Sequence, residues 1–258
     1  MFSPDHPELV FVQAAGYSRG RPDGPPLWIV VHDMEATETS TRAESTAAYF
    51  ANPGDGRSVS SHYTVDQDSV VQCVLLRDVA WTVGNRPGNN RGINWELSGF
   101  ARQSREQWLD PFGLAMFAQM APIVRADAAK YGIPLERRTV AELKAMRPGV
   151  TSHNDLRLAF GGTTHTDPGP NFPWDVFMTI MTEDEDMALS DADVQKIWTW
   201  DLKDGSEVDK AYWVVNRTAA GVADLQKRPP VQAAPISDED IARIAAAVVD
   251  LLHQRTAE

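Results

Sequence analysis

The chain has 258 residues, a formal net charge of −12 at pH 7 and one cysteine. This length suits one large domain with an appendage, and a hydrophobic fraction of 43% is sufficient for a packed core. The acidic balance and the lack of a basic run exclude nucleic acid as the main partner. No apolar run is long enough to span a bilayer, so we expect no membrane insertion.

The cysteine content and the N-terminal residues indicate in which cellular compartment the protein is made. A single cysteine, Cys73 in the apolar run VVQCVLL, excludes an intrachain disulfide and is typical of a buried thiol. The N-terminal residues MFSPDHPELVFVQ lack the basic region and the apolar stretch of a secretory signal. We therefore expect a protein made in the cytoplasm, with any export by another route.

Strand-like and helix-like segments alternate through residues 1–180, which predicts an α/β class with a mixed sheet flanked by helices. Residues 27–33, LWIVVHD, form a continuous apolar run, as expected of a central strand covered on both faces. Residues 93–99, INWELSG, alternate apolar with polar side chains. This alternation places Glu96 on the polar face of its strand.

Two helices show recognisable ends. Thr41 and Glu44 have the spacing of a capping box before a run of helix formers. A longer helical segment has Pro111 near its start and Gly132 as its stop signal. Pro122 lies inside that segment, so we expect it to kink the helix or to split it in two.

Composition changes divide the chain. Four consecutive acids near residue 184 suggest a boundary after a catalytic domain at residues 1–180. We expect a small helical region at residues 188–227 and a proline-rich linker at residues 228–236. Residues 237–254 show apolar side chains at helical spacing. This amphipathic C-terminal helix is too short to be stable alone, so we expect it to dock or to form a homo-oligomer.

Six histidines are the main candidates for chemistry. His6 and His253 lie near the ends of the chain, where we expect solvated side chains. Each of the others, taken alone, is more typical of a structural residue than of a ligand. His32 ends the first apolar strand and His153 lies in a polar turn, while Asp167 lies in a loop stiffened by prolines. Two imidazoles and a carboxylate from separate segments suit catalytic Zn²⁺ with one position open.

Six sequence blocks carry a resemblance to a known family. Between about residues 25 and 178 the chain contains VVHDMEAT, SSHYTVDQDS, AWTVGN, INWELSG, SHNDL and HTDPGPNFPWD. In order and spacing these resemble the type-2 N-acetylmuramoyl-L-alanine amidases, zinc enzymes that share their fold with peptidoglycan recognition proteins. The resemblance implies a mixed sheet flanked by helices, with His32, His153 and Asp167 as zinc ligands. It also implies that Glu96 is the catalytic base.

Three positions depart from the family pattern. Many relatives have lysine at the position of His165, where a cation stabilises the oxyanion of the tetrahedral intermediate. We expect His165 to donate a hydrogen bond in this role, although a rival assignment makes His165 the third ligand and Asp167 its supporting partner. Ser61 replaces a tyrosine and Thr82 a histidine of some relatives, so substrate contacts differ in detail.

The resemblance implies peptidoglycan as substrate, cleaved at the amide between N-acetylmuramic acid and L-alanine of the stem peptide. Trp81, Arg86 and Trp174 are candidates for holding sugar rings and peptide carboxylates. For each of these three, a structural role is the open alternative. His62 is a further candidate for lining the groove, with a structural role equally open.

The missing signal fits a phage endolysin of an actinobacterial host, released to the cell wall through a holin. The appended C-terminal region favours this interpretation over a cytosolic recycling amidase that acts on muropeptides. A catalytically inactive peptidoglycan-binding module of the same fold is a second alternative. A lysozyme-like enzyme with Glu35 and Glu96 as paired carboxylates is the third, and it leaves the histidines unexplained.

Overall fold

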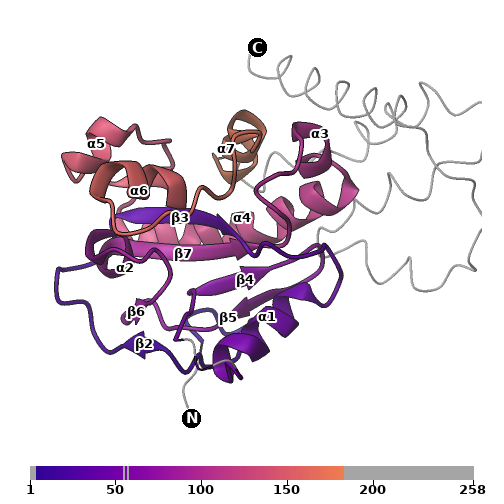
Figure 1. Ribbon diagram of the computed structural model, residues 1–258, viewed down its shortest axis with the longest axis horizontal. Coiled ribbons are helices and arrows are strands. Elements are labelled where there is room, and N and C mark those ends of the chain that lie inside the picture. The colour runs from indigo at the N-terminus through magenta and orange to yellow at the C-terminus, as the bar shows by residue number, and fades with distance from the viewer. Residues whose placement is uncertain (1–3, 55, 57, 183–258) are drawn as a thin grey trace, which may run out of the picture. The chain divides into compact units, whose positions relative to one another are not determined.

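The computed structural model of the chain describes residues 4–54, 56 and 58–182 (Figure 1). The boundaries expected at residues 188–227, 228–236 and 237–254 therefore lie outside the described residues. Within the described part, no helix combines the length and the apolar character needed to cross a bilayer. The alternating strands and helices belong to one compact unit of the chain.

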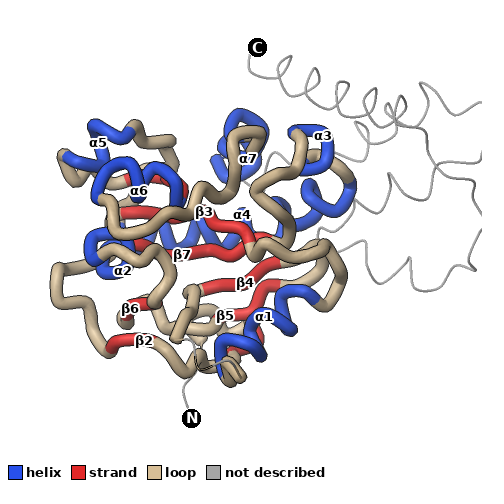
Figure 2. The backbone as a smooth tube through the Cα atoms, viewed as in Figure 1, coloured by secondary structure: helices blue, strands red, loops and turns tan. Residues whose placement is uncertain are grey.

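A mixed six-stranded sheet forms the centre of this unit (Figure 2). In spatial order its strands are β1 (Val10–Phe11), β5 (Val70–Gln72), β4 (Tyr63–Val65), β7 (Gly92–Leu97), β3 (Trp28–Asp33) and β8 (Gly149–Ser152). Neighbouring strands are parallel except for the antiparallel pair β4 and β5. A separate antiparallel ribbon pairs β2 (Tyr17–Ser18) with β6 (Val79–Ala80). The expected α/β class with a mixed sheet is confirmed.

Helices cover both faces of the sheet. The described helices are α1 (Arg42–Ala51), α2 (Arg86–Arg91), α3 (Arg105–Trp108), α4 (Pro111–Tyr131), α5 (Val140–Lys144), α6 (His153–Phe160) and α7 (Trp174–Thr182). The largest core cluster joins the sheet to α4 and α7, and Figure 1 shows α4 passing behind β3 and β7. Smaller clusters pack α1, and the pair α5 and α6, against the sheet.

Strand β3 is the central strand that its sequence predicts, because all six of its residues are buried. Ile29 and Val31 belong to the large core beneath α4. Trp28 and Val30 belong to the cluster beneath α5 and α6. Since side chains alternate along a strand, His32 lies on the face of Trp28 and Val30, near the carboxyl end of β3.

Helix α4 begins and ends where its sequence signals predict. Pro111 is its first residue, and Asp110 caps it by accepting a hydrogen bond from the backbone N–H of Gly113 at 2.9 Å. Gly132 ends the helix in the left-handed conformation, with φ of 64°. Pro122 lies inside one helix of 21 residues, so the helix is not split there.

The capping box predicted at the start of α1 is wrong. The Thr41 side chain makes no capping hydrogen bond. Instead, the Asp66 carboxylate accepts a hydrogen bond of 2.9 Å from the backbone N–H of Ala43. Asp66 also accepts from the backbone N–H of Ser69 in the turn between β4 and β5. One distant carboxylate thus caps the helix and orders the turn.

The expectation of a solvated His6 is also wrong. Nε2 of His6 lies 2.8 Å from Oδ1 of Asp127, a carboxylate buried within α4. The hydrogen bond to Asp127 raises the pKa of His6 above its usual value, against the opposing effect of burial. This pair fastens the N-terminal segment to the long helix.

We predict that His6→Ala lowers the free energy of unfolding by about 1–3 kcal/mol at mildly acidic pH, because it leaves a buried carboxylate without its partner. Since the folded pKa of His6 is raised, its stabilisation is fully present below about pH 6.5 and declines as pH rises through the folded pKa. Urea unfolding at about pH 5.5 and about pH 8.5 measures this difference. The control is Glu44→Gln, an exposed carboxylate on α1. An equal loss at both pH values would contradict the prediction.

Candidate metal centre

Three of the predicted site residues meet at the carboxyl ends of neighbouring strands. His32 lies near the end of β3. His153 is the first residue of α6, directly after β8, and not in the polar turn that we expected. Asp167 comes from the loop between α6 and α7. All three residues are buried, and within the described residues they form the one group of histidine, cysteine and acidic side chains close enough to hold a metal ion.

The donor atoms of these residues form a small triangle. Nδ1 of His32 lies 3.0 Å from Nδ1 of His153. Each carboxylate oxygen of Asp167 lies 3.2 Å from one of these nitrogens. Ligands bound about 2.0–2.1 Å from a tetrahedral metal ion are about 3.3 Å apart. The two nitrogens are therefore spaced like two corners of a tetrahedron, and the carboxylate lies beside both of them, which leaves a fourth position for a group from outside the triangle.

Hydrogen bonds on the far side of each ring fix which nitrogen faces the triangle. Nε2 of His153 lies 3.0 Å from the backbone carbonyl of Val83, which only accepts, so Nε2 carries the proton. Nε2 of His32 likewise lies 3.0 Å from the side-chain oxygen of Asn94. In the neutral form of each ring, Nδ1 then carries the lone pair. Metal-ligating histidines are typically held in this way.

The charge state of the three groups also suits a cation. Burial opposes the ionisation of Asp167, but hydrogen bonds and charge from His153 and His32 outweigh it and hold the pKa of this carboxyl well below its usual range. Without a metal ion, this effect requires a proton on the ring nitrogens that face the carboxylate. Burial lowers the pKa of His153, which favours loss of that proton from its imidazole. A bound cation would replace such a proton, with nitrogen lone pairs and an anionic carboxylate directed at it inside the protein.

The loop that carries Asp167 is anchored at both sides. The backbone carbonyl of Asp167 accepts a hydrogen bond of 3.1 Å from the backbone N–H of Asn154 in α6. Gly169 has φ of 90°, and a β-carbon there would lie 1.9 Å from the carbonyl oxygen of Ala101. Only glycine fits this close approach to the segment after β7. These contacts hold the carboxylate with little freedom.

Glu96 lies beside the metal-ligand triangle. It pairs in register with His32 across β7 and β3, so the two side chains share a face of the sheet. The residue is half-buried, and its carboxyl makes no hydrogen bond or ion pair within the described part of the chain. Burial, followed by the charge of Asp167, raises the pKa of Glu96 well above its usual value. A carboxyl with a raised pKa accepts and returns protons near neutral pH.

His165 lies next to the triangle but outside it. Its ring stacks on that of His153, with centroids 5.1 Å apart and an interplanar angle of 1°. Its Nδ1 is 3.9 Å from Asp167, beyond hydrogen-bond distance, and its side chain is 68% exposed. The geometry therefore favours Asp167 over His165 as the third ligand.

The structure does not bring His62 to the surface. His62 is fully buried, and its Nε2 lies 2.8 Å from Nη2 of the half-buried Arg21. Its Nδ1 accepts a hydrogen bond from the backbone N–H of Asn94. Burial, reinforced by the charge of Arg21, lowers the pKa of His62 well below its usual value. These contacts favour the structural role that the sequence left open.

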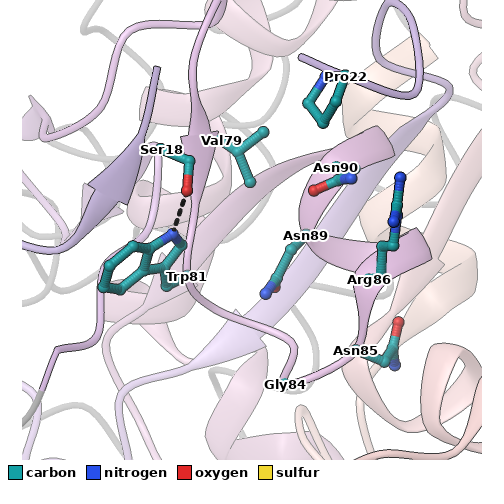
Figure 3. Close-up of a pocket in the computed structure, with 9 residues that line it drawn as sticks. All are labelled: Ser18, Pro22, Val79, Trp81, Gly84, Asn85, Arg86, Asn89 and Asn90. Carbon is teal, nitrogen blue, oxygen red and sulfur yellow. Dashed lines mark hydrogen bonds between the residues drawn. The ribbon is translucent and has the colours of Figure 1, made fainter. Parts of the chain in front are cut away.

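The three other substrate-contact candidates separate into two groups. Trp174 packs against Phe172 and Phe177 in the main core, and the Arg137 guanidinium lies 3.8 Å from its ring centroid. A structural role is therefore favoured for Trp174. Trp81 and Arg86 are exposed and line one open pocket (Figure 3).

Two buried polar residues near the triangle were not identified from sequence. Asn94 orients His32, and the one available signal was its place on the polar face beside Glu96. Asp33 follows His32, and one of its carboxylate oxygens has no partner within the described part of the chain. Burial raises the pKa of Asp33 to about 8. The role of Asn94 depends on a contact between distant segments.

Comparisons with known proteins agree with this picture. The family model described as N-acetylmuramoyl-L-alanine amidase matches residues 22–170. The solved structure of the Staphylococcus aureus hydrolase AmiA in complex with its ligand is similar, with a TM-score of 0.51 and 21% identity over 70% of this chain and 83% of AmiA. This likeness confirms the fold expected from the resemblance. No curated protein matches the chain.

Two further solved structures show a weaker likeness. A selenomethionine derivative of AmpD has a TM-score of 0.48 and 22% identity, over 70% of this chain and 100% of AmpD. A mutant endolysin from Bacillus subtilis has a TM-score of 0.46 and 20% identity, over 67% of this chain and 98% of the endolysin.

We predict that Asn94→Ala weakens Zn²⁺ binding about 10–100-fold, because the His32 ring loses the acceptor that fixes its orientation. Competition with a chelator of known affinity measures this change. Asn94→Asp is the matched control, since it keeps an oxygen acceptor at the same place and should bind Zn²⁺ at least as tightly as the native protein. Native affinity in Asn94→Ala would show that Asn94 does not position the ligand.

Proposed function

The chain belongs to the N-acetylmuramoyl-L-alanine amidase family, and we propose that it is a zinc-dependent peptidoglycan hydrolase that cleaves the amide between N-acetylmuramic acid and L-alanine of the stem peptide. The observation that carries the proposal is the buried triangle of His32, His153 and Asp167, in which the two Nδ1 atoms lie 3.0 Å apart and each is 3.2 Å from one carboxylate oxygen. Its size and its lone pairs fit Zn²⁺.

The three ligands have separate contributions in this proposal. His32 and His153 offer neutral nitrogens that Asn94 and Val83 hold in place. Asp167 contributes the negative charge that favours a divalent cation over water in a buried site. Zinc, when bound, supplies Lewis-acid polarisation of the scissile carbonyl and of water.

Glu96 acts as the general base in this proposal. Its side chain lies on the same face as His32, and its carboxyl is free of competing hydrogen bonds among the described residues. The burial that raises its pKa matches a group that takes a proton from attacking water and delivers it to the leaving amine nitrogen. His32, beside it, is committed to the triangle and is not available for proton transfer.

His165 stabilises the oxyanion of the tetrahedral intermediate in this proposal. Stacking on His153 places its ring at the rim of the site, and its large exposed fraction leaves an N–H free to meet the substrate. One positioned donor of this kind contributes about 10²–10³-fold to the rate in other acyl-transfer enzymes.

The same proposal extends to the biological role and the rest of the chain. We place the activity in a phage endolysin of an actinobacterial host, made in the cytoplasm and released through a holin to act on the wall. The catalytic domain occupies residues 1–180. A helical region at 188–227, a linker at 228–236 and a self-associating helix at 237–254 complete this organisation.

The direct test is end-group analysis of purified peptidoglycan after digestion. We predict new L-alanine amino termini without new reducing sugars, and loss of this product after chelation. Glu96→Gln should reduce the rate by about 10²–10⁴-fold while the protein retains Zn²⁺. Glu44→Gln, an exposed carboxylate on α1, is the control and should retain full activity.

Two results would contradict this proposal in different ways. New reducing ends would identify a glycan-cleaving enzyme and remove the reason for a metal. No new ends, together with retained binding to the wall, would identify a recognition module of the same fold.

Substitutions at the rim distinguish the two assignments of the third ligand. We predict that His165→Ala lowers kcat about 10²-fold or more without changing Zn²⁺ affinity, because it removes an oxyanion donor. His165→Lys should restore activity, since an ammonium group also stabilises the oxyanion. Asp167→Ala should lose Zn²⁺. Loss of the metal in His165→Ala would instead make His165 the ligand.

A further inference from the structure

The first turn of helix α6 is connected to two of the three proposed metal ligands. His153 is its first residue, and the backbone N–H of Asn154 donates a hydrogen bond of 3.1 Å to the backbone carbonyl of Asp167. The first N–H groups of a helix have no partner inside the helix, so this donor is free to hold a neighbouring segment. The position of this turn therefore places both ligands relative to His32 on β3.

Ser152 and Asp155 fix the shape of the turn. Oγ of Ser152 accepts a hydrogen bond of 3.1 Å from the backbone N–H of Asp155, as an N-cap residue does. The same hydroxyl donates to Oδ2 of Asp155 at 2.6 Å. His153 lies between these two residues, so whatever holds the Asp155 carboxylate also holds the backbone that carries His153.

Arg137 binds that carboxylate from outside the helix. Its Nη2 donates to Oδ2 of Asp155, in an ion pair whose side chains are 28% and 17% exposed. A partly buried pair of this kind is screened less by salt than a pair at the surface. Nη1 of Arg137 donates to the backbone carbonyl of Arg138 at 3.0 Å, which fixes the plane of the guanidinium.

The backbone of Arg137 is itself fixed at the edge of the sheet. Arg137 forms a parallel bridge with Val150 of β8. The backbone N–H of Val150 donates to the carbonyl of Glu136 at 2.8 Å, and that of Arg138 donates to the carbonyl of Val150 at 2.9 Å. Strand β8 leads directly into α6, so Arg137 is anchored to the strand that precedes His153.

The guanidinium also meets the segment that follows Asp167. Its central carbon lies 3.8 Å from the ring centroid of Trp174, which is a cation–π contact. Trp174 is the first residue of α7 and packs against Phe172 and Phe177 in the main core. Figure 1 shows the path of the chain from α6 to α7, on which the Asp167 loop lies. Arg137 therefore contacts the helix before this loop and the helix after it.

We propose that Arg137 is a positioning residue for the metal centre, which sets the separation of His153 and Asp167 by joining Asp155 to Trp174. Within the described residues its side chain makes no hydrogen bond or ion pair with the three ligands, so it acts through its partners. A planar guanidinium stacks on an indole while its edge donates to a carboxylate, and an ammonium group does not replace both contacts. The inference rests on the proposed function, because it takes the triangle as a Zn²⁺ site.

The test measures the Zn²⁺ affinity of the full chain by competition with a chelator of known affinity. We expect Arg137→Gln to weaken binding about 10–100-fold, and Arg137→Lys, which keeps the charge, to weaken it less. Arg105→Gln is the matched control and should bind Zn²⁺ as the parent does. Arg105 donates two hydrogen bonds of 2.7 Å to Asp175 in the first turn of α7, and within the described residues it pairs with no residue of α6.

A double variant tests whether Arg137 acts through Asp155. Asp155→Asn keeps an oxygen for Ser152 and removes the charge that binds Arg137, so it should weaken Zn²⁺ binding to a similar extent. Combining it with Arg137→Gln should cost little further affinity, because both changes break the same connection. Losses that add in full would overturn the proposed connection.

Urea unfolding of the metal-free protein separates positioning from a general loss of stability. A merely structural role would lower the unfolding midpoint and leave the Zn²⁺ affinity of the folded protein unchanged. Native affinity in folded Arg137→Gln, or in Arg137→Lys should the glutamine variant not fold, would overturn the inference. Absence of Zn²⁺ binding in the parent would reject the metal centre itself and this inference with it, and that failure is visible without any variant.

Discussion

The site depends on one physical constraint: two imidazole nitrogens and a carboxylate face one another at 3.0–3.2 Å in a buried place. Such groups have given up hydration by water, so the arrangement is costly unless a proton or a metal cation lies among them. The surrounding contacts of His32, His153 and Asp167 all support that arrangement. The proposed chemistry depends on the metal ion that best fits it.

The fold meets this constraint by using elements that are themselves buried and packed against neighbours. β3 is buried along its whole length, and α6 begins directly after β8, so two of the ligands follow from strand ends in one sheet. Asn94 and Val83 orient the two imidazole rings by accepting hydrogen bonds from their Nε2–H groups. Gly169 lets the third ligand's loop approach Ala101 closely. Each ligand is therefore held by packing or by backbone, with little ordering left to the metal ion.

Local sequence patterns predicted the elements whose positions depend on residues close together in the chain. The apolar run that ends at His32, the alternation that places Glu96 and the ends of α4 at Pro111 and Gly132 all appear where the sequence places them. The family resemblance added the ligand set, which the structure brings together but which remains a proposal as a zinc site.

The features that sequence missed are those made between distant segments. Asp66 caps α1 in place of Thr41, because the fold brings its carboxylate within hydrogen-bond distance of a backbone N–H in the first turn of the helix. His6 looks like a terminal residue in sequence, yet it pairs with a carboxylate 121 positions away. In the sequence, Asn94 is an ordinary polar residue on a strand. Its role becomes visible only when the structure places its side-chain oxygen beside His32. The spacing of apolar and polar residues along the chain does not reveal such contacts.

The most direct test of the central claim is zinc X-ray absorption spectroscopy of the purified full-length protein. We expect one Zn²⁺ per chain, bound by two imidazole nitrogens and one carboxylate oxygen at about 2.0–2.2 Å, with one further light-atom ligand. Sulfur from Cys73, a third imidazole in place of the carboxylate, or no zinc retained at this site would contradict the claim.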